Sequence, residues 1–362
     1  MSPHRIAVAL GSLAIATLLS PRAGAEPYLA VQQGYKCVSC HVNPTGGGLR
    51  SGFGTVFAEN VLPEWTLPAG FPVWKGDVLK FLRLGADYRT ARIDTDVPNQ
   101  PMVRQDGLEQ LRAYGDLTII PRWLDYYVDE LMAPGKAFAE EYYAKLTSPD
   151  QKVYFKAGQF YLPFGWRLQD QTAFVREITG ISMTTPDKGF ELGLELPSWS
   201  AQVDYTRGEA NVSGATGHQW TGQVVYVQPK WRAGLSSAFE QSSLGNRQTV
   251  GTFAGLKTGP VAWLGELDFV HDEGFPGGRR MAVLLGEADW ALHKGHNFKV
   301  TAELLDPDRT VANDQEARWS FLYEWTPIPF VQLRTGWRRY RGIPQNDLDN
   351  RRMLFIELHA FL

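Results

Sequence analysis

The sequence predicts an all-β protein: an antiparallel β-barrel of about sixteen strands that follows a short N-terminal segment of different character. Three observations predict it. From about residue 79 onward, short segments alternate between apolar and polar residues. Short and long connections alternate as well, and no apolar run after residue 25 reaches the length of a membrane-spanning helix. The net charge of −3 argues against a nucleic-acid partner.

The first 25 residues have the pattern of a signal peptide. Arg5 supplies a positive start, residues 6–20 form an apolar run, and residues 23–25 (Ala-Gly-Ala) offer a cleavage site. The run is shorter than the ~20 residues that a bilayer span requires, which argues against an uncleaved anchor. We therefore expect export and a mature chain that begins at Glu26.

The predicted strands have one apolar face and one charged face. Phe190, Leu192 and Leu194, for example, alternate with Glu191 and Glu195. In a soluble sandwich the apolar face would form the core, so alternation alone does not identify a membrane barrel. The predicted strands lie near residues 81–93, 108–121, 123–132, 139–148, 153–165, 189–197, 199–209, 218–229, 231–242, 247–259, 261–273, 279–292, 296–305, 317–326, 330–341 and 351–362.

The connections and the last strand favour an outer-membrane barrel. Short turns, as at 197–198 and 326–329, alternate with longer polar connections, as at 208–217, 306–316 and 342–350. Outer-membrane barrels have short periplasmic turns and long outer loops. The final strand resembles their C-terminal signature, because its apolar residues share one parity up to the last position, although that position is usually Phe. These residues are Leu354, Ile356, Leu358, Ala360 and Leu362. We expect a barrel over residues 79–362, surrounded by the outer-membrane lipid of a Gram-negative bacterium.

The two cysteines of the chain are Cys37 and Cys40, and His41 follows them directly. Attachment of a c-type haem needs two thiols for thioether bonds and the adjacent histidine as iron ligand. A thioredoxin-like pair would need a βαβ context, and a zinc site would need a second pair of ligands. Because His41 fits only the first of these three alternatives, we expect one covalent haem c, with His41 as the proximal ligand of the iron.

Residues 26–78 form the expected haem-binding segment. The segment is too short and too rich in Gly and Pro to enclose a haem alone, so we expect it to fold into the barrel mouth or lumen like a plug. The glycines at 46–48 would let the backbone approach the haem ring, and Arg50 could pair with a haem propionate. Alternatively, the glycines form a plain turn and Arg50 is solvated.

The sequence does not identify the second axial ligand of the haem. By strand parity, His359 and His293 point toward the lumen, although such histidines are more often solvated than bound to metal. Further candidates are His271 and His296 at strand ends, and Met102 and Met132.

The signal peptide, the single Cys37-x-x-Cys40-His41 motif and the following barrel resemble the fused monohaem cytochrome–porins of iron-oxidising bacteria. Residues 158–165 are also similar to a strand-and-turn pattern of phosphate-selective-type porins. The resemblance implies electron transfer across the outer membrane. It also implies an extracellular donor, such as ferrous iron, and a periplasmic carrier, such as a soluble cytochrome. Enzymatic activity would then be limited to Fe(II) oxidation by the cytochrome.

A second hypothesis is a substrate- or anion-selective porin with a plug segment and no electron-transfer role. Lumen-facing arginines could select anions, or they could balance the lumen carboxylates. The arginines are Arg232, Arg318, Arg334 and Arg338, and the carboxylates are Glu191, Glu195 and Glu324. A soluble enzyme ranks third, because the sequence contains no catalytic triad, phosphate-binding loop or paired-carboxylate arrangement.

Overall fold

The computed structural model describes residues 26–68, 70–208 and 216–362. The expected signal peptide, residues 1–25, lies outside the described residues. The strands are β1 (Asp77–Leu79), β2 (Leu82–Asp96), β3 (Val103–Ile120), β4 (Leu124–Ala133), β5 (Phe138–Thr147), β6 (Val153–Phe160), β7 (Asp187–Glu195), β8 (Trp199–Thr206), β9 (Gly217–Val227), β10 (Trp231–Ser242), β11 (Gly245–Thr258), β12 (Val261–Asp272), β13 (Arg279–His293), β14 (His296–Asp306), β15 (Glu316–Ile328), β16 (Val331–Arg341) and β17 (Arg352–Phe361). The helices are α2 (Pro27–Gln33), α3 (Cys37–Cys40), α4 (Gly52–Asn60), α5 (Phe174–Thr179) and the 3-10 helix η1 (Asp347–Asn350).

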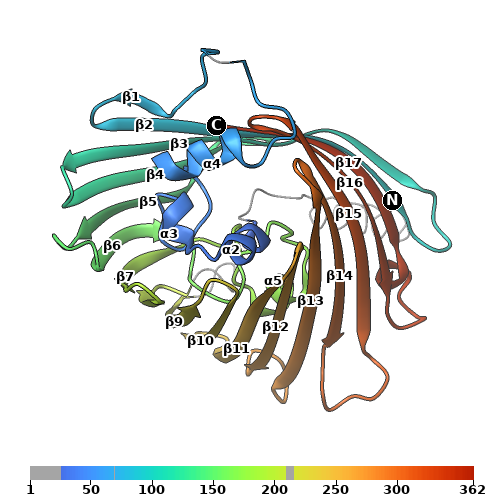
Figure 1. Ribbon diagram of the computed structural model, residues 1–362. Helices are drawn as coiled ribbons and strands as arrows, with labels where there is room; N and C mark the ends of the chain where they lie inside the picture. Colours follow the sequence, from blue (N-terminus) through green and yellow to red (C-terminus); the bar gives the residue numbers. More distant parts are fainter. Residues whose placement is uncertain (1–25, 69, 209–215) are drawn as a thin grey trace.

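The strands form a closed barrel (Figure 1). Each strand from β2 to β17 pairs antiparallel with its neighbours in sequence, and the pairing of β17 with β2 closes the ring. The short β1 of this 17-stranded sheet pairs only with β2, so the wall has 16 strands. Closure leaves no unpaired edge. The predicted fold class is confirmed.

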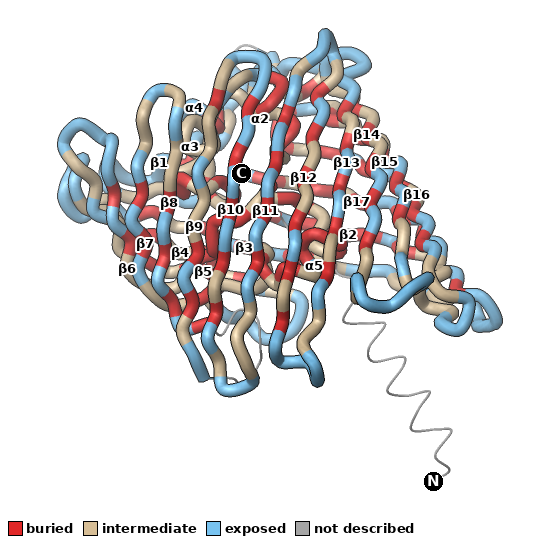
Figure 2. Tube along the Cα trace, turned by 90° about the horizontal axis from the view of Figure 1, so that it is seen from below, coloured by how far each residue is buried: buried red, intermediate tan, exposed pale blue. Residues whose placement is uncertain are grey.

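The wall has apolar residues outside and polar residues inside, as the alternation of exposure along each strand in Figure 2 indicates. On β17, Leu354 and Ile356 are 51% and 58% exposed, whereas Glu357 is fully buried. On β7, Leu192 is 51% exposed and Glu191 is fully buried. A soluble barrel would have the opposite polarity, so this barrel is built for contact with lipid on its outer surface.

The two ends of the barrel differ in their connections. One end, which we call the short-turn end, carries the turns 121–123, 148–152, 196–198, 228–230, 259–260, 294–295 and 329–330. The other, the long-loop end, carries the connections 97–102, 134–137, 161–186, 207–216, 243–244, 273–278, 307–315 and 342–351, of which 209–215 lie outside the described residues. The predicted alternation of short and long connections is confirmed. Short turns mark the periplasmic end of such barrels.

Five of the exposed tryptophans follow the short-turn end. Each lies in one of its turns or on a strand next to one, with its side chain on the outer surface. They are Trp123, Trp199, Trp231, Trp263 and Trp290. Tryptophan is enriched at membrane–water interfaces because its ring is apolar and its N–H is polar. The belt therefore marks one border of the lipid-facing band.

Two segments enter the lumen (Figure 1). Residues 26–65, which we call the plug, contain α2, α3 and α4 and lie at the short-turn end. Residues 161–186, which we call the inward connection, leave β6 and carry α5 into the barrel. The sequence predicts strand through residue 165, but β6 ends at Phe160, because Leu162 and Phe164 turn inward and pack in a buried cluster of the lumen. Among the described residues, no helix is both long and apolar enough to cross a bilayer.

Candidate functional site

The plug is attached to the turns of the short-turn end. The Lys36 ammonium donates to the Leu196 carbonyl at 2.7 Å and forms an ion pair with Glu195. At the other end of the plug, the Glu64 backbone N–H donates to the Thr326 carbonyl at 2.8 Å. The Gln32 side-chain amide donates to the Pro260 carbonyl, and the Lys257 ammonium donates to the Gln32 backbone carbonyl, both at 2.6 Å. The plug is therefore fixed at several points around the rim.

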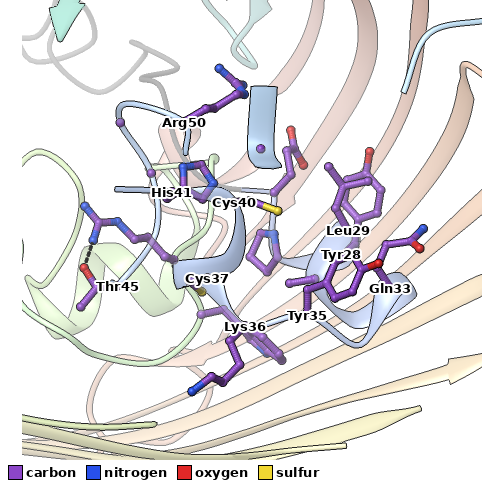
Figure 3. A pocket seen from close by; sticks show the side chains of 18 of the residues that line it. Tyr28, Leu29, Gln33, Tyr35, Lys36, Cys37, Cys40, His41, Thr45 and Arg50 are labelled. Atoms are coloured by element: carbon purple, nitrogen blue, oxygen red, sulfur yellow. Dashed lines mark hydrogen bonds between the residues drawn. The ribbon is translucent and has the colours of Figure 1, made fainter. Parts of the chain in front are cut away.

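The cysteine motif forms one turn of helix. Cys37 and Cys40 begin and end α3, and the His41 backbone N–H donates to the Cys37 carbonyl at 3.0 Å. No disulfide joins the two cysteines. The chain then turns back, and His41 pairs with Arg50 in an antiparallel bridge. Figure 3 shows Cys37, Cys40, His41 and Arg50 around one cavity.

Glycines permit the close packing around this turn. Gly48 has a φ of +62°, and a Cβ there would lie 2.0 Å from the Tyr127 hydroxyl oxygen. That hydroxyl accepts a hydrogen bond from the Leu49 backbone N–H at 3.1 Å. At Gly54, a Cβ would lie 2.0 Å from the Cys40 carbonyl oxygen, so α4 can lie against α3 only without a side chain here. These glycines are needed for the shape of the motif.

Asn43 holds the motif against the barrel wall. It is fully buried, and its amide nitrogen donates to the Glu141 carboxylate at 3.0 Å. Its carbonyl oxygen accepts from the Lys156 ammonium at 3.1 Å. Lys156 in turn pairs with Glu191 at 2.6 Å. One plug side chain thus links the Glu141 carboxylate to the Lys156–Glu191 ion pair of the wall.

The cavity lies between the plug, the wall and the inward connection. It contains about 1700 Å³ of space free of protein atoms, including the open solvent at its mouth. The plug contributes Cys37, Cys40, His41, Arg50 and Phe57; the wall contributes Tyr114, Phe253, His359 and Phe361; the inward connection contributes Trp166, Arg167 and Met183.

Burial controls the protonation of the motif. It lowers the pKa of His41 to about 3, with Arg50 and Arg167 adding to the shift. The imidazole is therefore neutral at physiological pH, and its buried Nδ1 has no hydrogen-bond partner. Burial also raises the pKa of the Cys37 and Cys40 thiols. A neutral imidazole is the form that ligates metals.

Two arginines border the cavity. The Arg50 guanidinium lies 4.2 Å from the centroid of the Phe361 ring, and burial lowers its pKa. Within the described part of the chain, no ion pair or hydrogen bond of this guanidinium is found. Arg167 donates to the Thr45 hydroxyl at 2.5 Å, and its buried Nε and Nη2 make no hydrogen bond. The sequence singled out Arg50 but missed Arg167, which no motif marks.

The candidate histidines lie in different surroundings. His359 is buried and lines the cavity, on the lumen side that strand parity predicts. His293 has the lumen parity of β13, but the register shifts between Ala291 and His293, and His293 is exposed and does not line the cavity. Its ring lies 3.8 Å from that of His296, which contacts Glu64 at 3.1 Å. The expectation that His293 faces the lumen is wrong.

The lumen arginines of the porin hypothesis are all engaged. Arg334 pairs with Glu324 at 3.0 Å and with Glu357 at 2.9 Å. Arg232 donates to the plug carbonyl of Ala30 at 2.6 Å. Remaining pairs are Arg318 with Glu303 and Asp170, and Arg338 with Asp170. These arginines balance wall carboxylates or hold the plug, which favours the second of the two roles considered for them.

Comparisons with known proteins identify the barrel alone. A scan of protein-family models and a search of curated proteins find no match. Solved structures do match. The anion-selective porin from Comamonas acidovorans has a TM-score of 0.62 and 10% identity, covering 78% of this chain and 99% of that one. OprB of Pseudomonas putida has a TM-score of 0.59 and 9% identity, covering 78% and 94%. The channel DcaP of Acinetobacter baumannii has a TM-score of 0.56 and 11% identity, covering 78% and 97%.

At these identities the similarity shows the fold, which is that of outer-membrane porins. The outward apolar face, the polar lumen and the tryptophan belt are properties of this chain itself, and they require a lipid surrounding. The protein is therefore an outer-membrane β-barrel, as the sequence predicts.

Proposed function

We propose that this barrel is an electron-transfer porin in which one haem c is attached through Cys37 and Cys40 and ligated by His41. The observation that carries the proposal is the common position of these three side chains at one wall of a lumen cavity. One helical turn presents both thiols, and the histidine follows directly. This is the arrangement that c-type attachment needs.

The residues around the cavity fit this group. The neutral imidazole of His41 is ready to ligate iron, and its buried Nδ1 lacks a partner. Arg50 and Arg167 supply positive charge for two propionates. Trp166 and Phe253, with ring centroids 5.0 Å apart, give an apolar surface. When bound, the haem would supply one-electron oxidation and reduction.

The chain's own residues position the site and shield it from water. Lys36 precedes Cys37 and fixes the start of the motif to the turn after β7. Asn43 fixes its other end to the wall. Trp166, which is 4% exposed, packs the inward connection against the strands and lines the cavity. A shielded pocket raises the influence of the surrounding dipoles on a redox group.

The location of the plug gives the proposed direction. It lies at the short-turn end, which is periplasmic in barrels of this kind. A redox group held there would be within reach of a periplasmic carrier, such as a soluble cytochrome. Electrons would come from an extracellular donor, such as ferrous iron, at the long-loop end. In this arrangement the protein would belong with the fused monohaem cytochrome–porins of iron-oxidising bacteria, and its reaction would be Fe(II) oxidation.

The test is a redox titration of protein purified from outer membranes of cells with cytochrome-maturation machinery. Anaerobic ferrous iron should produce the absorbance bands of reduced c-type haem, and oxidised soluble cytochrome c should then remove them. The double variant Cys37→Ser/Cys40→Ser, with folding checked by heat-modifiable gel migration, should show no bands. Liposome swelling by small solutes together with an absence of haem staining in the wild-type protein would instead favour a plugged porin.

A further inference from the structure

The proposed haem site leaves one axial position of the iron open. His41 accounts for the first position, and histidine or methionine are common second ligands. Among residues 26–68, 70–208 and 216–362, the only such side chains besides His41 that line the cavity are His359 and Met183. Met102 and Met132, which the sequence suggested, are 60% and 45% exposed and lie outside the lining. The choice is therefore between a wall residue and a residue of the inward connection.

His359 is already committed to the wall. Its Nε2 lies 2.8 Å from the Asp87 carboxylate, and its Nδ1 lies 3.2 Å from the Gln332 side-chain oxygen. The Arg89 guanidinium lies 3.0 Å from the same Nε2. His359 is 5% exposed, so withdrawing its ring would leave a buried carboxylate without one of its partners. This network makes His359 a structural residue.

Met183 is buried beside the cysteine motif. It is 3% exposed, and its terminal methyl carbon lies 2.8 Å from the position that a Cβ on Gly47 would occupy. Gly47 also lies beside the His41 imidazole. The Met183 backbone is held in place, because its N–H donates to the Gln171 side chain at 2.9 Å. Among the described residues, no hydrogen bond of the Met183 thioether is found, in contrast to the network of His359.

Building on the proposed haem site, we propose that Met183 is the second axial ligand. A thioether is a soft, neutral ligand that binds iron without losing a proton. Methionine–histidine ligation also raises the haem potential, which suits a group that must accept electrons from a weak reductant. The two ligands come from different segments, His41 from the plug and Met183 from the inward connection. Ligation would therefore join the two segments across the cavity.

The test compares two buried methionines in the full-length, matured protein. Met183→Leu keeps the volume but removes the sulfur, and Met281→Leu makes the same change at a buried methionine that does not line the cavity. Met183→Leu should abolish the near-infrared thioether–iron(III) absorbance band, lower the reduction potential and allow added imidazole or carbon monoxide to bind. Met183→His should keep a low-spin haem with the signature of two histidines. Met281→Leu should match the wild-type protein.

The outcomes separate this inference from the proposed function. A haem that is attached in the wild-type protein, but whose band and potential are unchanged in Met183→Leu, would overturn the assignment and leave electron transfer standing. Loss of the band in His359→Gln with retention in Met183→Leu would assign the ligand to the wall instead. A wild-type protein without any haem would overturn both proposals.

Discussion

The plug and the inward connection both fill the lumen, but they are held there by different interactions. The inward connection is fixed by buried ion pairs: Arg176 with Glu266, and Asp170 with Arg318 at 3.0 Å and Arg338 at 2.9 Å. The plug is held mainly by hydrogen bonds to backbone carbonyls at the rim and to wall side chains. Ion pairs between opposite charges fix the inward connection. Most contacts of the plug have at least one uncharged partner, and the ion pairs Lys36–Glu195 and Lys299–Glu26 are exceptions.

This difference in anchoring fits two different roles of the two segments. The inward connection behaves as part of the wall, with Phe174 and Val175 at most 2% exposed and continuous with the lumen core. The plug carries the thiols and follows an unusual backbone path through consecutive glycines of positive φ. A segment that receives a haem after export, as proposed, would benefit from anchors that can form around the attached group. A fixed wall opposite then defines the shape of the cavity.

The largest effect is expected from breaking a charged anchor of the inward connection. Arg176→Ala leaves Glu266 buried without its cation, which costs about 3–5 kcal/mol of unfolding free energy. Urea unfolding in detergent micelles measures this loss of unfolding free energy. Arg104→Ala removes an exposed pair with Asp94, at 2.8 Å, and should cost at most about 1 kcal/mol. Equal effects of the two substitutions would contradict the role of the buried Arg176–Glu266 pair as an anchor.

A smaller effect is expected from Gly48→Ala in the plug. A residue other than glycine at positive φ costs about 1–3 kcal/mol, and here the new Cβ also meets the Tyr127 hydroxyl. Protease sensitivity of the plug should rise while the barrel remains intact. Tyr127→Phe in the same chain should recover part of the loss. Gly70 has a φ of +85°, and a Cβ added there would meet no atom within 4 Å. Gly70→Ala is therefore the control that measures the cost of backbone strain alone.

The smallest effect is expected at the last attachment of the plug. The Trp325 indole donates to the Glu64 carboxylate at 2.8 Å, which, with His296, lowers the pKa of Glu64 below 4.5. The carboxylate therefore stabilises the attachment fully above about pH 4.5, and this contribution is lost as the pH falls through the lowered pKa. At neutral pH, Glu64→Gln should slightly increase the rate of hydrogen exchange at backbone amides near residue 64. A pH dependence that persists in the variant would contradict this role.

The sequence predicts the barrel well because a wall of alternating faces repeats the same physical pattern in every strand. Predicted and observed strands agree closely at β10, β12 and β16. The predicted end of β6 is wrong because residues 161–165 are apolar enough to continue a strand, yet Leu162 and Phe164 pack inside the lumen. The alternation of apolar and polar residues does not indicate where the chain leaves the sheet and enters the lumen.

The cavity is less predictable, because its lining comes from segments far apart in the sequence. Cys37, Cys40 and His41 are recognisable by their spacing, and Arg50 lies close by. Arg167 and Met183 belong to a connection without periodicity, and only the folding of that connection into the barrel brings them to the plug. Strand parity correctly predicts that His359 faces the lumen. It does not reveal the hydrogen bonds that occupy both ring nitrogens of this residue.

The intact mass of the mature protein tests the central claim most directly. Protein from outer membranes of cells that mature c-type cytochromes should have the mass of the chain from Glu26 to Leu362 plus one haem, with neither thiol open to alkylation after denaturation. A mass of the polypeptide alone, with Cys37 and Cys40 both alkylated, would contradict the account.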